Sequence, residues 1–293
     1  MSRLHGYLAI IASAVGFSTL DLFGRWVVAE GVNTSSLLFL RFTIAAVVMG
    51  AICVARGERL PAPRALWPLI GMGAIGYVGQ ATCYLTALQF ASAGLVSLLL
   101  YLYPVLVAAL SVLFLRERLT RARVLALLLA LGGVALTVGP VTGEWRGVAF
   151  ALGAAAIYSV YIIVGDRVLA TVSPWMSSAV IFAAAGAMSG ALSLIGGVTL
   201  PATPGGWGSM AGIVALATLM PVSLFLLGVA RIGATNAALL STLEPIVTAL
   251  LAAWAFAERL GPLTLAGGAL ILLAAVVVVL GRDRHPTEAP TVA

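Results

Sequence analysis

Hydrophobic stretches of about 20 residues follow one another along nearly the whole chain, separated by short breaks that contain arginine, proline or glycine. A helix needs about 20 apolar residues to cross the hydrocarbon core of a bilayer. The pattern therefore predicts an all-α integral membrane protein with ten transmembrane helices. The expected spans are residues 6–28, 34–55, 66–89, 93–115, 121–139, 145–167, 174–196, 207–230, 233–256 and 262–281.

Composition excludes the main alternatives to a membrane protein. Of the 293 residues, 62% are hydrophobic and 9% are charged, whereas a soluble domain has about 45–50% apolar and about 25% charged residues. The mean hydropathy of +1.13 argues against a soluble enzyme, a disordered chain or a small secreted domain. The two cysteines, Cys53 and Cys83, lie in apolar stretches and predict neither a disulfide framework nor a metal site.

The net charge is +6, because 16 arginines outnumber 10 acidic residues. The arginines are scattered singly along the chain. A nucleic-acid surface would show a basic cluster, so we expect no nucleic-acid partner. Loops on the cytoplasmic side of a membrane carry an excess of basic residues. This rule predicts a multi-pass protein of the cell (inner) membrane with both termini in the cytoplasm. Of the arginines, Arg25, Arg146 and Arg259 then lie on the outer side, Arg41 lies within a span, and the other twelve lie on the inner side.

An offset of 141 residues aligns the two halves of the chain without a gap. The matched positions include Ser18 with Ser159, Pro104 with Pro245, and Glu117-Arg118-Leu119 with Glu258-Arg259-Leu260.

Two five-helix repeats, 1–140 and 141–281, follow from this offset, with a cytoplasmic tail over 282–293 that we expect to be disordered. Because five is an odd number, the second repeat crosses the membrane in the opposite sense to the first. Inverted repeats of this kind usually build transporters that work by alternating access. The alternative is a duplication that serves packing alone.

Each half has a fourth helix with a proline that ends in an acidic-Arg-Leu turn, within residues 98–119 and 239–260. Over about residues 6–281, this arrangement resembles the EamA-type members of the drug/metabolite transporter superfamily. Arg41 matches an arginine common in the first copy of that family, whereas Phe182 stands at the equivalent place in the second copy. The resemblance implies that helices 1–4 and 6–9 surround a central cavity and that helices 5 and 10 are peripheral.

Ionisable residues inside a span are costly and are functional candidates. Asp21 and Arg41 are expected about 5 Å above the midplane on the first two helices, and Arg25 follows Asp21 by one turn. Two interpretations remain open. The residues form a structural ion pair that fixes the packing of these helices, or they form a gate near the outer mouth.

Glu244 lies almost at the centre of the ninth expected span, directly before Pro245. Proline removes one helical hydrogen bond, so we expect Pro104 and Pro245 to act as helix hinges. A carboxyl group at this depth is either protonated or faces a water-filled cavity. Glu244 is therefore expected either to bind substrate or to be a structural, hydrogen-bonded side chain. Tyr103 occupies the equivalent place in the first half.

Aromatic and polar side chains recur at helical spacing on four of the expected helices. Each set alone is typical of packing, but together they are expected to line a neutral cavity near mid-depth. The candidate substrate-binding residues are Ser13, Phe17, Tyr77, Gln80, Tyr84, Ser97, Tyr101, Tyr158, Tyr161 and Glu244.

The spans contain no constellation of residues that is typical of a catalytic site. The two histidines, His5 and His285, lie at the ends of the chain, and no glycine-rich phosphate loop with a lysine occurs. We therefore expect no catalytic activity, no metal and no other cofactor.

The expected partners are a small-molecule substrate and the lipid bilayer, with the oligomeric state left open. EamA-type relatives include exporters of amino acids and other amphipathic metabolites, and tyrosine-rich walls suit an aromatic side chain. We therefore expect a secondary transporter that exports amino acids, with a preference for aromatic ones. The alternatives are a channel, a membrane scaffold that transports nothing, or a transporter of another metabolite class.

Overall fold

The computed structural model describes residues 3–137, 142–256 and 261–280. These residues form a bundle of helices, and the pairing of β type among them is a single bridge between Ala91 and Gly143. Within the described residues, eight helices are long and apolar enough to cross a membrane. This confirms the prediction of an all-α membrane protein. The second Glu-Arg-Leu turn and the tail with Arg282, Arg284 and His285 lie outside the described residues.

Within the described residues, helices cover parts of each of the expected spans. In the first half they are α1 (Arg3–Ala29), α2 (Thr34–Ala55), α3 (Pro63–Gly71) with π-helix η1 (Met72–Tyr77) and α4 (Val78–Ala87), α5 (Ala93–Leu100) with α6 (Tyr103–Phe114), and α7 (Arg121–Thr137). In the second half they are α8 (Trp145–Val168), α9 (Pro174–Gly196), α10 (Pro204–Val214) with π-helix η2 (Ala215–Leu219) and α11 (Met220–Ile232), α12 (Ala234–Ser241) with α13 (Glu244–Phe256), and α14 (Pro262–Leu280).

Two of these segments are not among the eight membrane-spanning candidates. They are the segment of α3, η1 and α4, expected over 66–89, and the 17-residue α7, expected over 121–139. The count of ten transmembrane helices therefore stays a prediction.

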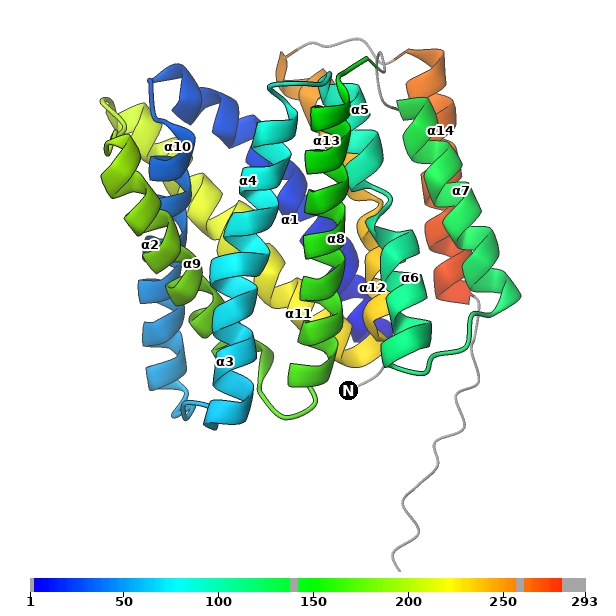
Figure 1. Cartoon of the computed structure of the whole chain (residues 1–293), viewed down its shortest axis with the longest axis horizontal. Helices are drawn as coiled ribbons and strands as arrows, with labels where there is room; N and C mark the ends of the chain where they lie inside the picture. Colours follow the sequence, from blue (N-terminus) through cyan, green and yellow to red (C-terminus); the bar gives the residue numbers. More distant parts are fainter. Residues whose placement is uncertain (1–2, 138–141, 257–260, 281–293) are drawn as a thin grey trace, which may run out of the picture.

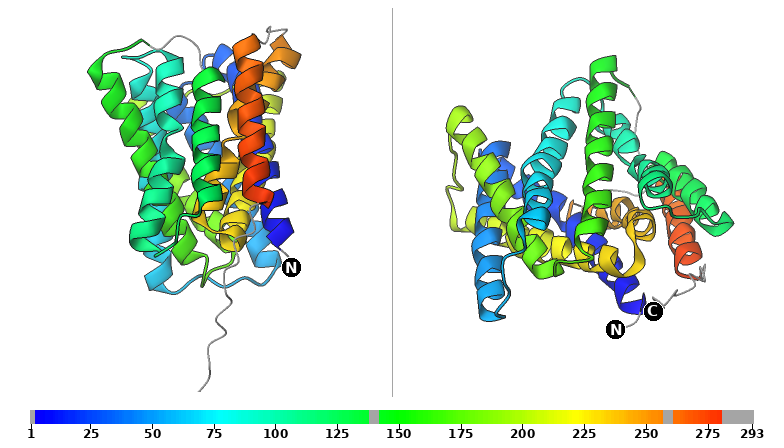
Figure 2. Two further views of the ribbon diagram at one scale, coloured as in Figure 1. Left: turned by 90° about the vertical axis from the view of Figure 1, so that its right-hand side faces the viewer. Right: turned by 60° about the horizontal axis from the view of Figure 1, so that its bottom comes forward.

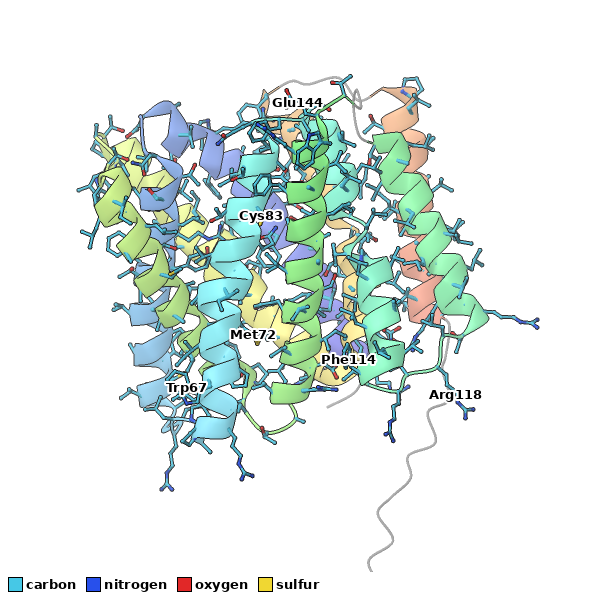
Figure 3. All side chains as sticks on the ribbon, viewed as in Figure 1. Trp67, Met72, Cys83, Phe114, Arg118 and Glu144 are labelled. Atoms are coloured by element: carbon cyan, nitrogen blue, oxygen red, sulfur yellow. The ribbon has the colours of Figure 1, made fainter. Side chains whose placement is uncertain are left out.

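The two halves of the chain have matching secondary structure. The helices α3, α5, α6 and α7 begin 141 residues before α10, α12, α13 and α14, respectively. In Figure 1, α1 begins at the lower edge of the bundle, whereas its counterpart α8 begins at the upper edge. Figure 3 places Glu144, just before α8, at the upper edge and Arg118, in the first Glu-Arg-Leu turn, at the lower edge.

The fourth helix of each half is broken near its middle, where the sequence pattern predicts one continuous span. The first break lies between Leu100 and Tyr103, and the second lies between Ser241 and Glu244. Each new half-helix has a proline, Pro104 or Pro245, as its second residue. Proline is well tolerated in the first turn of a helix because the N–H group that it lacks has no partner there.

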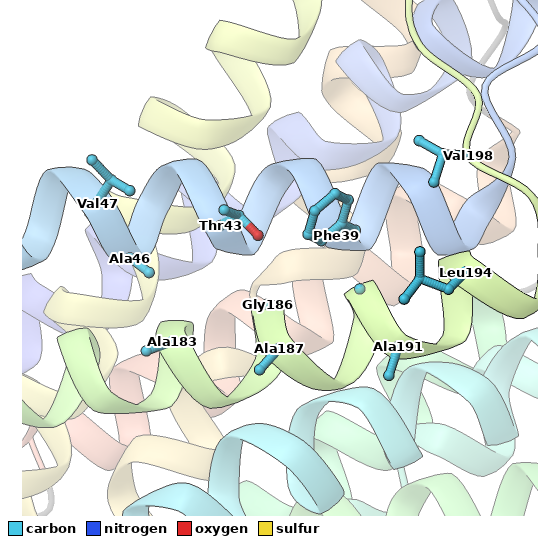
Figure 4. A pocket seen from close by; sticks show the side chains of 11 residues that line it. Phe39, Thr43, Ala46, Val47, Ala183, Gly186, Ala187, Ala191, Leu194 and Val198 are labelled. Carbon is cyan, nitrogen blue, oxygen red and sulfur yellow. The ribbon is translucent and has the colours of Figure 1, made fainter.

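Close packing between helices depends on glycines that face a neighbouring backbone. The α2 and α9 helices lie side by side, and Gly186 and Gly190 face Thr43 and Phe39 along the shallow groove in Figure 4. The α7 and α14 helices pair at one edge of the bundle in Figures 1 and 2. A Cβ atom on Gly133 would lie 2.6 Å from the carbonyl oxygen of Gly267, so this pair needs a small residue.

The lower and upper parts of the bundle are packed to different degrees. Seven of the eight residues of α12 are buried, whereas Val96 is the buried residue of its counterpart α5. The half-helix α6 buries five residues, whereas its counterpart α13, all of which the structure describes, buries Ile246. In Figure 1, α6 and α12 occupy the lower part and α5 and α13 the upper part. The broken helices are therefore tightly packed below and loosely packed above.

Candidate functional site

Each helix break is held by a serine from the other half of the chain. Ser18, on α1, donates a hydrogen bond to the carbonyl oxygen of Glu244 at 3.1 Å. Ser159, on α8 and 141 residues later, donates to the carbonyl oxygen of Tyr103 at 3.3 Å. The same repeat symmetry thus relates both serines and both acceptors. The Tyr103 hydroxyl also donates to the carbonyl oxygen of Ala238 at 3.2 Å, so the first break lies against α12, the half-helix that ends at the second break.

Each serine also bonds within its own helix. Ser18 donates to Ala14 at 2.7 Å, and Ser159 donates to Ala155 at 2.7 Å. A hydroxyl group has one proton to donate, so the bond to the break competes with the intrahelical bond. A serine hydroxyl that loses its hydrogen bond to the break therefore still has an acceptor in its own helix. Separation of the serine from the break leaves no hydroxyl group without a partner.

Glu244 is the first residue of α13, and its side chain is half-buried. A negative charge at this position is favoured by the dipole of the half-helix. Within the described residues no arginine lies within ion-pair distance of the Glu244 carboxyl group, and Asp21 is close enough for their charges to interact. Among the described residues, the Glu244 carboxyl group thus offers a hydrogen-bond acceptor that no arginine pairs with.

Aromatic rings form a continuous run from the first break to α2. Consecutive ring centroids along this run are 4.8 to 6.2 Å apart, the range typical of interacting rings. The aromatic run consists, in order, of Tyr101, Tyr103, Tyr158, Tyr161, Tyr77 and Phe42.

Four members of the aromatic run are among the expected site residues, namely Tyr77, Tyr101, Tyr158 and Tyr161. The prediction missed Tyr103 and Phe42. Tyr103 could have been found because it is the repeat counterpart of Glu244, whereas a single phenylalanine in an apolar span gives no signal. The hydroxyl group of Tyr161 is buried without a hydrogen-bond partner in the described structure, so the run has an unused polar group.

The other expected lining residues lie around the run rather than in it. The Tyr84 hydroxyl lies 3.4 Å from the Ser97 hydroxyl and joins α4 to α5. Ser13 is buried and donates to the carbonyl oxygen of Pro221 at 2.7 Å, which indicates a structural contact. Phe17 and Gln80 are half-buried.

The expected ion pair between Asp21 and Arg41 is not formed in the described chain, and Arg41 bonds to a backbone carbonyl instead. Asp21 is exposed and Arg41 is buried. Arg41 donates to the carbonyl oxygen of Ala217 at 3.4 Å. That oxygen lacks its usual helical partner because Pro221, four residues later, has no N–H group.

Aromatic rings complete the surroundings of both arginines. The Arg41 guanidinium lies 4.8 Å from the ring centroid of Phe42 and 5.9 Å from that of Tyr77, a cation–π arrangement. Arg25 lies 4.6 Å from the ring centroid of Phe256 and interacts electrostatically with Asp21. The positive charge of Arg41 thus lies beside the far end of the aromatic run.

Comparison with known proteins gives two matches to one family. The sequence model of the EamA-like transporter family matches residues 4–139 and, a second time, residues 145–280. The two matched ranges are themselves 141 residues apart. A crystal structure that is 26% identical in sequence has a TM-score of 0.84, and the match covers 95% of this chain and 98% of the other.

Two curated proteins are also similar. An uncharacterized transporter of Archaeoglobus fulgidus is 30% identical over 174 residues, which cover 58% of this chain and 60% of the relative. The aromatic amino acid exporter YddG of Ancylobacter novellus is 30% identical over 167 residues, which cover 53% of this chain and 58% of the relative. The chain thus spans about three fifths of the length of these two relatives.

Proposed function

Because this chain belongs to the EamA-like transporter family, we propose that it is a secondary transporter that exports amino acids, aromatic ones first, by alternating access. The observation that carries the proposal is the meeting of two broken helices beside a run of tyrosines. Discontinuous helices in inverted-repeat transporters commonly form the substrate site. The similarity to an aromatic amino acid exporter supports the choice of substrate.

The lining favours a zwitterion with an apolar side chain. Tyr77, Tyr101 and Tyr158 provide flat walls with hydroxyl groups, and the carboxyl group of Glu244 accepts hydrogen bonds from an ammonium group. A phosphorylated sugar would need a pair of basic residues, and the described aromatic run has Arg41 alone at its end. The proposed site thus suits an amino acid better than a sugar phosphate.

The proposed architecture is ten transmembrane helices in two inverted repeats, over 1–140 and 141–281. The matching element boundaries and the opposite directions of α1 and α8 support this arrangement. The arginine bias supports placement in the cell (inner) membrane with both termini in the cytoplasm. The lower edge of Figure 1, which holds the first Glu-Arg-Leu turn, is then the cytoplasmic side.

Labelling of single cysteines tests the topology. In a variant without Cys53 and Cys83, a cysteine at Thr120 is expected to react with a membrane-impermeant maleimide from the cytoplasm, and one at Gly261 from the outside. The reason is that the two positions follow repeat-equivalent turns of opposite orientation. Labelling of both positions from the same side would contradict the inverted repeat.

Reconstitution into liposomes tests the function. Vesicles that contain the protein are expected to take up labelled phenylalanine saturably, and faster than vesicles without it. Flux that does not saturate would indicate a channel, and no flux of any solute would indicate a scaffold. Uptake of sugar phosphates without amino acids would contradict the proposed substrate but not the fold.

Alanine in place of Tyr101 or Tyr84 is expected to lower phenylalanine flux about threefold to tenfold, because each loses an aromatic contact surface worth about 0.5–1.5 kcal/mol. Tyr7→Ala is the matched control, since Tyr7 lies near the start of α1 and is not among the expected substrate-binding residues. Flux is measured per folded protein in liposomes. Equal losses in all three variants would show that these tyrosines stabilise the fold rather than bind substrate.

A further inference from the structure

Polar side chains from both halves of the chain meet at the lower end of the bundle, where α12 begins. Arg123, on α7, forms an ion pair with Glu117 at 2.8 Å. Glu117 also accepts a hydrogen bond from the Thr235 hydroxyl at 3.0 Å, and Arg123 donates to the side chain of Asn236 at 3.3 Å. The backbone N–H of Ala234 donates to Asp166 at 3.1 Å.

Two of these hydrogen bonds join one half of the chain to the other. Glu117 and Arg123 belong to the first half, and their partners Thr235 and Asn236 belong to α12 in the second. The Arg123 side chain is 6% exposed, so its charge depends on these partners for the contacts that water would otherwise supply. The first turn of α12 is therefore tied to the end of α6 and the start of α7.

Among the residues that the structure describes, the upper end does not repeat this set of side chains. At the positions 141 residues away, Arg25 replaces Asp166, Thr264 replaces Arg123, and Gly94 and Leu95 replace the two α12 residues. The remaining counterpart, Glu258, lies outside the described residues. At the upper end, the Ser92 hydroxyl instead caps the N-terminus of α5 by accepting a hydrogen bond from the backbone N–H of Leu95.

The packing of the broken helices follows the same asymmetry. The half-helix α12, which carries these contacts, is buried along seven of its eight residues, whereas α5 at the upper end buries one residue. Within the part of the chain that the structure describes, the bundle is thus closed where the polar contacts are formed and looser where their counterparts are missing.

We propose that Glu117, Arg123, Asp166, Thr235 and Asn236 form a lock that closes the substrate pathway at the lower face. The inference rests on the proposed function, because it assigns these residues the cytoplasmic closure of an alternating-access cycle. The lock residues are positioning residues: they hold the start of α12 against α8 and against the turn between α6 and α7, and they do not touch substrate. Opening the lower face breaks the bonds of Thr235 and Asn236, while the Glu117–Arg123 pair stays intact within the first half.

Weakening the bonds between the halves tests the lock without substrate. The variant Thr235→Val, Asn236→Leu removes both hydrogen bonds at nearly constant side-chain size. In a background without native cysteines, Ala238→Cys on the buried face of α12 reports lower-side access to an impermeant maleimide. We expect labelling from the lower side to become at least tenfold faster, because both lost hydrogen bonds have a charged partner.

Thr137→Val is the matched control, because Thr137 lies on α7 and bonds within its own helix to Val134 at 2.8 Å. It is expected to leave the labelling rate unchanged. Unchanged labelling in the double variant, or an equal increase in the control, would overturn the lock. A shift in labelling in a protein that transports no solute would support the lock and contradict the proposed function, so the two failures are distinguishable.

Cross-linking provides a second measurement if the double variant does not fold. Cysteines at Glu117 and Thr235, joined by a short bismaleimide, are expected to hold the lower face closed and to lower phenylalanine flux at least tenfold. The same double-cysteine protein without reagent is the reference, so that loss of the native contacts is accounted for. Flux that persists in fully cross-linked protein would overturn the proposal.

Discussion

Glu244→Gln is expected to reduce amino acid export about tenfold to a hundredfold while the protein still folds. Glutamine keeps the size of the side chain and its place as the first residue of α13, but it removes the negative charge. A hydrogen bond to a charged group contributes about 1.5–3 kcal/mol, and an ammonium group of the substrate would lose this amount. The measurement is saturable phenylalanine flux in liposomes, normalised to folded protein.

The pH dependence separates a functional role of Glu244 from a structural one. If Glu244 binds substrate as a carboxylate, transport by the natural protein falls as the pH is lowered and the carboxylate is protonated, and the glutamine variant loses this dependence. Glu144→Gln is a suitable control because Glu144 also stands at the start of a helix but is exposed at the upper edge. A glutamine variant at position 244 with unchanged flux and an unchanged pH profile would leave Glu244 as a structural residue.

Gly73→Ala is expected to destabilise the fold by about 1–3 kcal/mol, the usual cost of an extra group in a packed core. Gly73 lies in η1 against α9, and a Cβ atom there would clash with the carbonyl oxygen of Ile181 and lie 2.8 Å from the Cβ of Ala184. Backbone cannot yield as a flexible side chain does, so the two helices must separate. A thermal unfolding scan in detergent measures the effect.

Gly71→Ala is a matched control two residues away. A Cβ atom at Gly71 would meet nothing within 4 Å, and alanine is favoured over glycine in helices by about 0.5–1 kcal/mol. This variant should therefore unfold at the same temperature as the natural protein or slightly higher. Similar destabilisation of both variants would show that flexibility of the segment, rather than close approach to α9, explains the glycines.

The helical character and the internal repeat could be predicted because they depend on patterns within the sequence. Apolar runs define the helices, and a shared offset of prolines and charged turns aligns the halves. The breaks were located only in part. Pro104 and Pro245 marked the position as a hinge, but the expected spans ran straight through it, because apolar residues continue on both sides of each proline.

The candidate site was predictable where it follows helical spacing and not where it depends on distant backbone. Tyr77 and Tyr101 were found from their periodicity. The partner of Arg41 was missed because it is the carbonyl oxygen of Ala217, 176 residues away in the sequence, which Pro221 leaves without its helical partner. No pattern of side chains reveals it. The lower lock was missed for a similar reason, since Thr235 and Asn236 are ordinary residues until the fold brings them to Glu117 and Arg123.

The crossed contacts of the two serines impose an order on the biosynthesis of the protein. Ser159 is synthesised 56 residues after Tyr103, whereas Glu244 follows Ser18 by 226 residues. At about 5–20 residues per second, the first break waits about 3–11 s for its serine, but Ser18 waits about 11–45 s for its acceptor. During that interval the Ser18 hydroxyl can donate to the carbonyl oxygen of Ala14 within α1, so the helix enters the bilayer with this hydroxyl group hydrogen-bonded. In a nascent chain that stalls before residue 244, the contact between Ser159 and Tyr103 can form, whereas Ser18 on α1 still lacks the Glu244 carbonyl group.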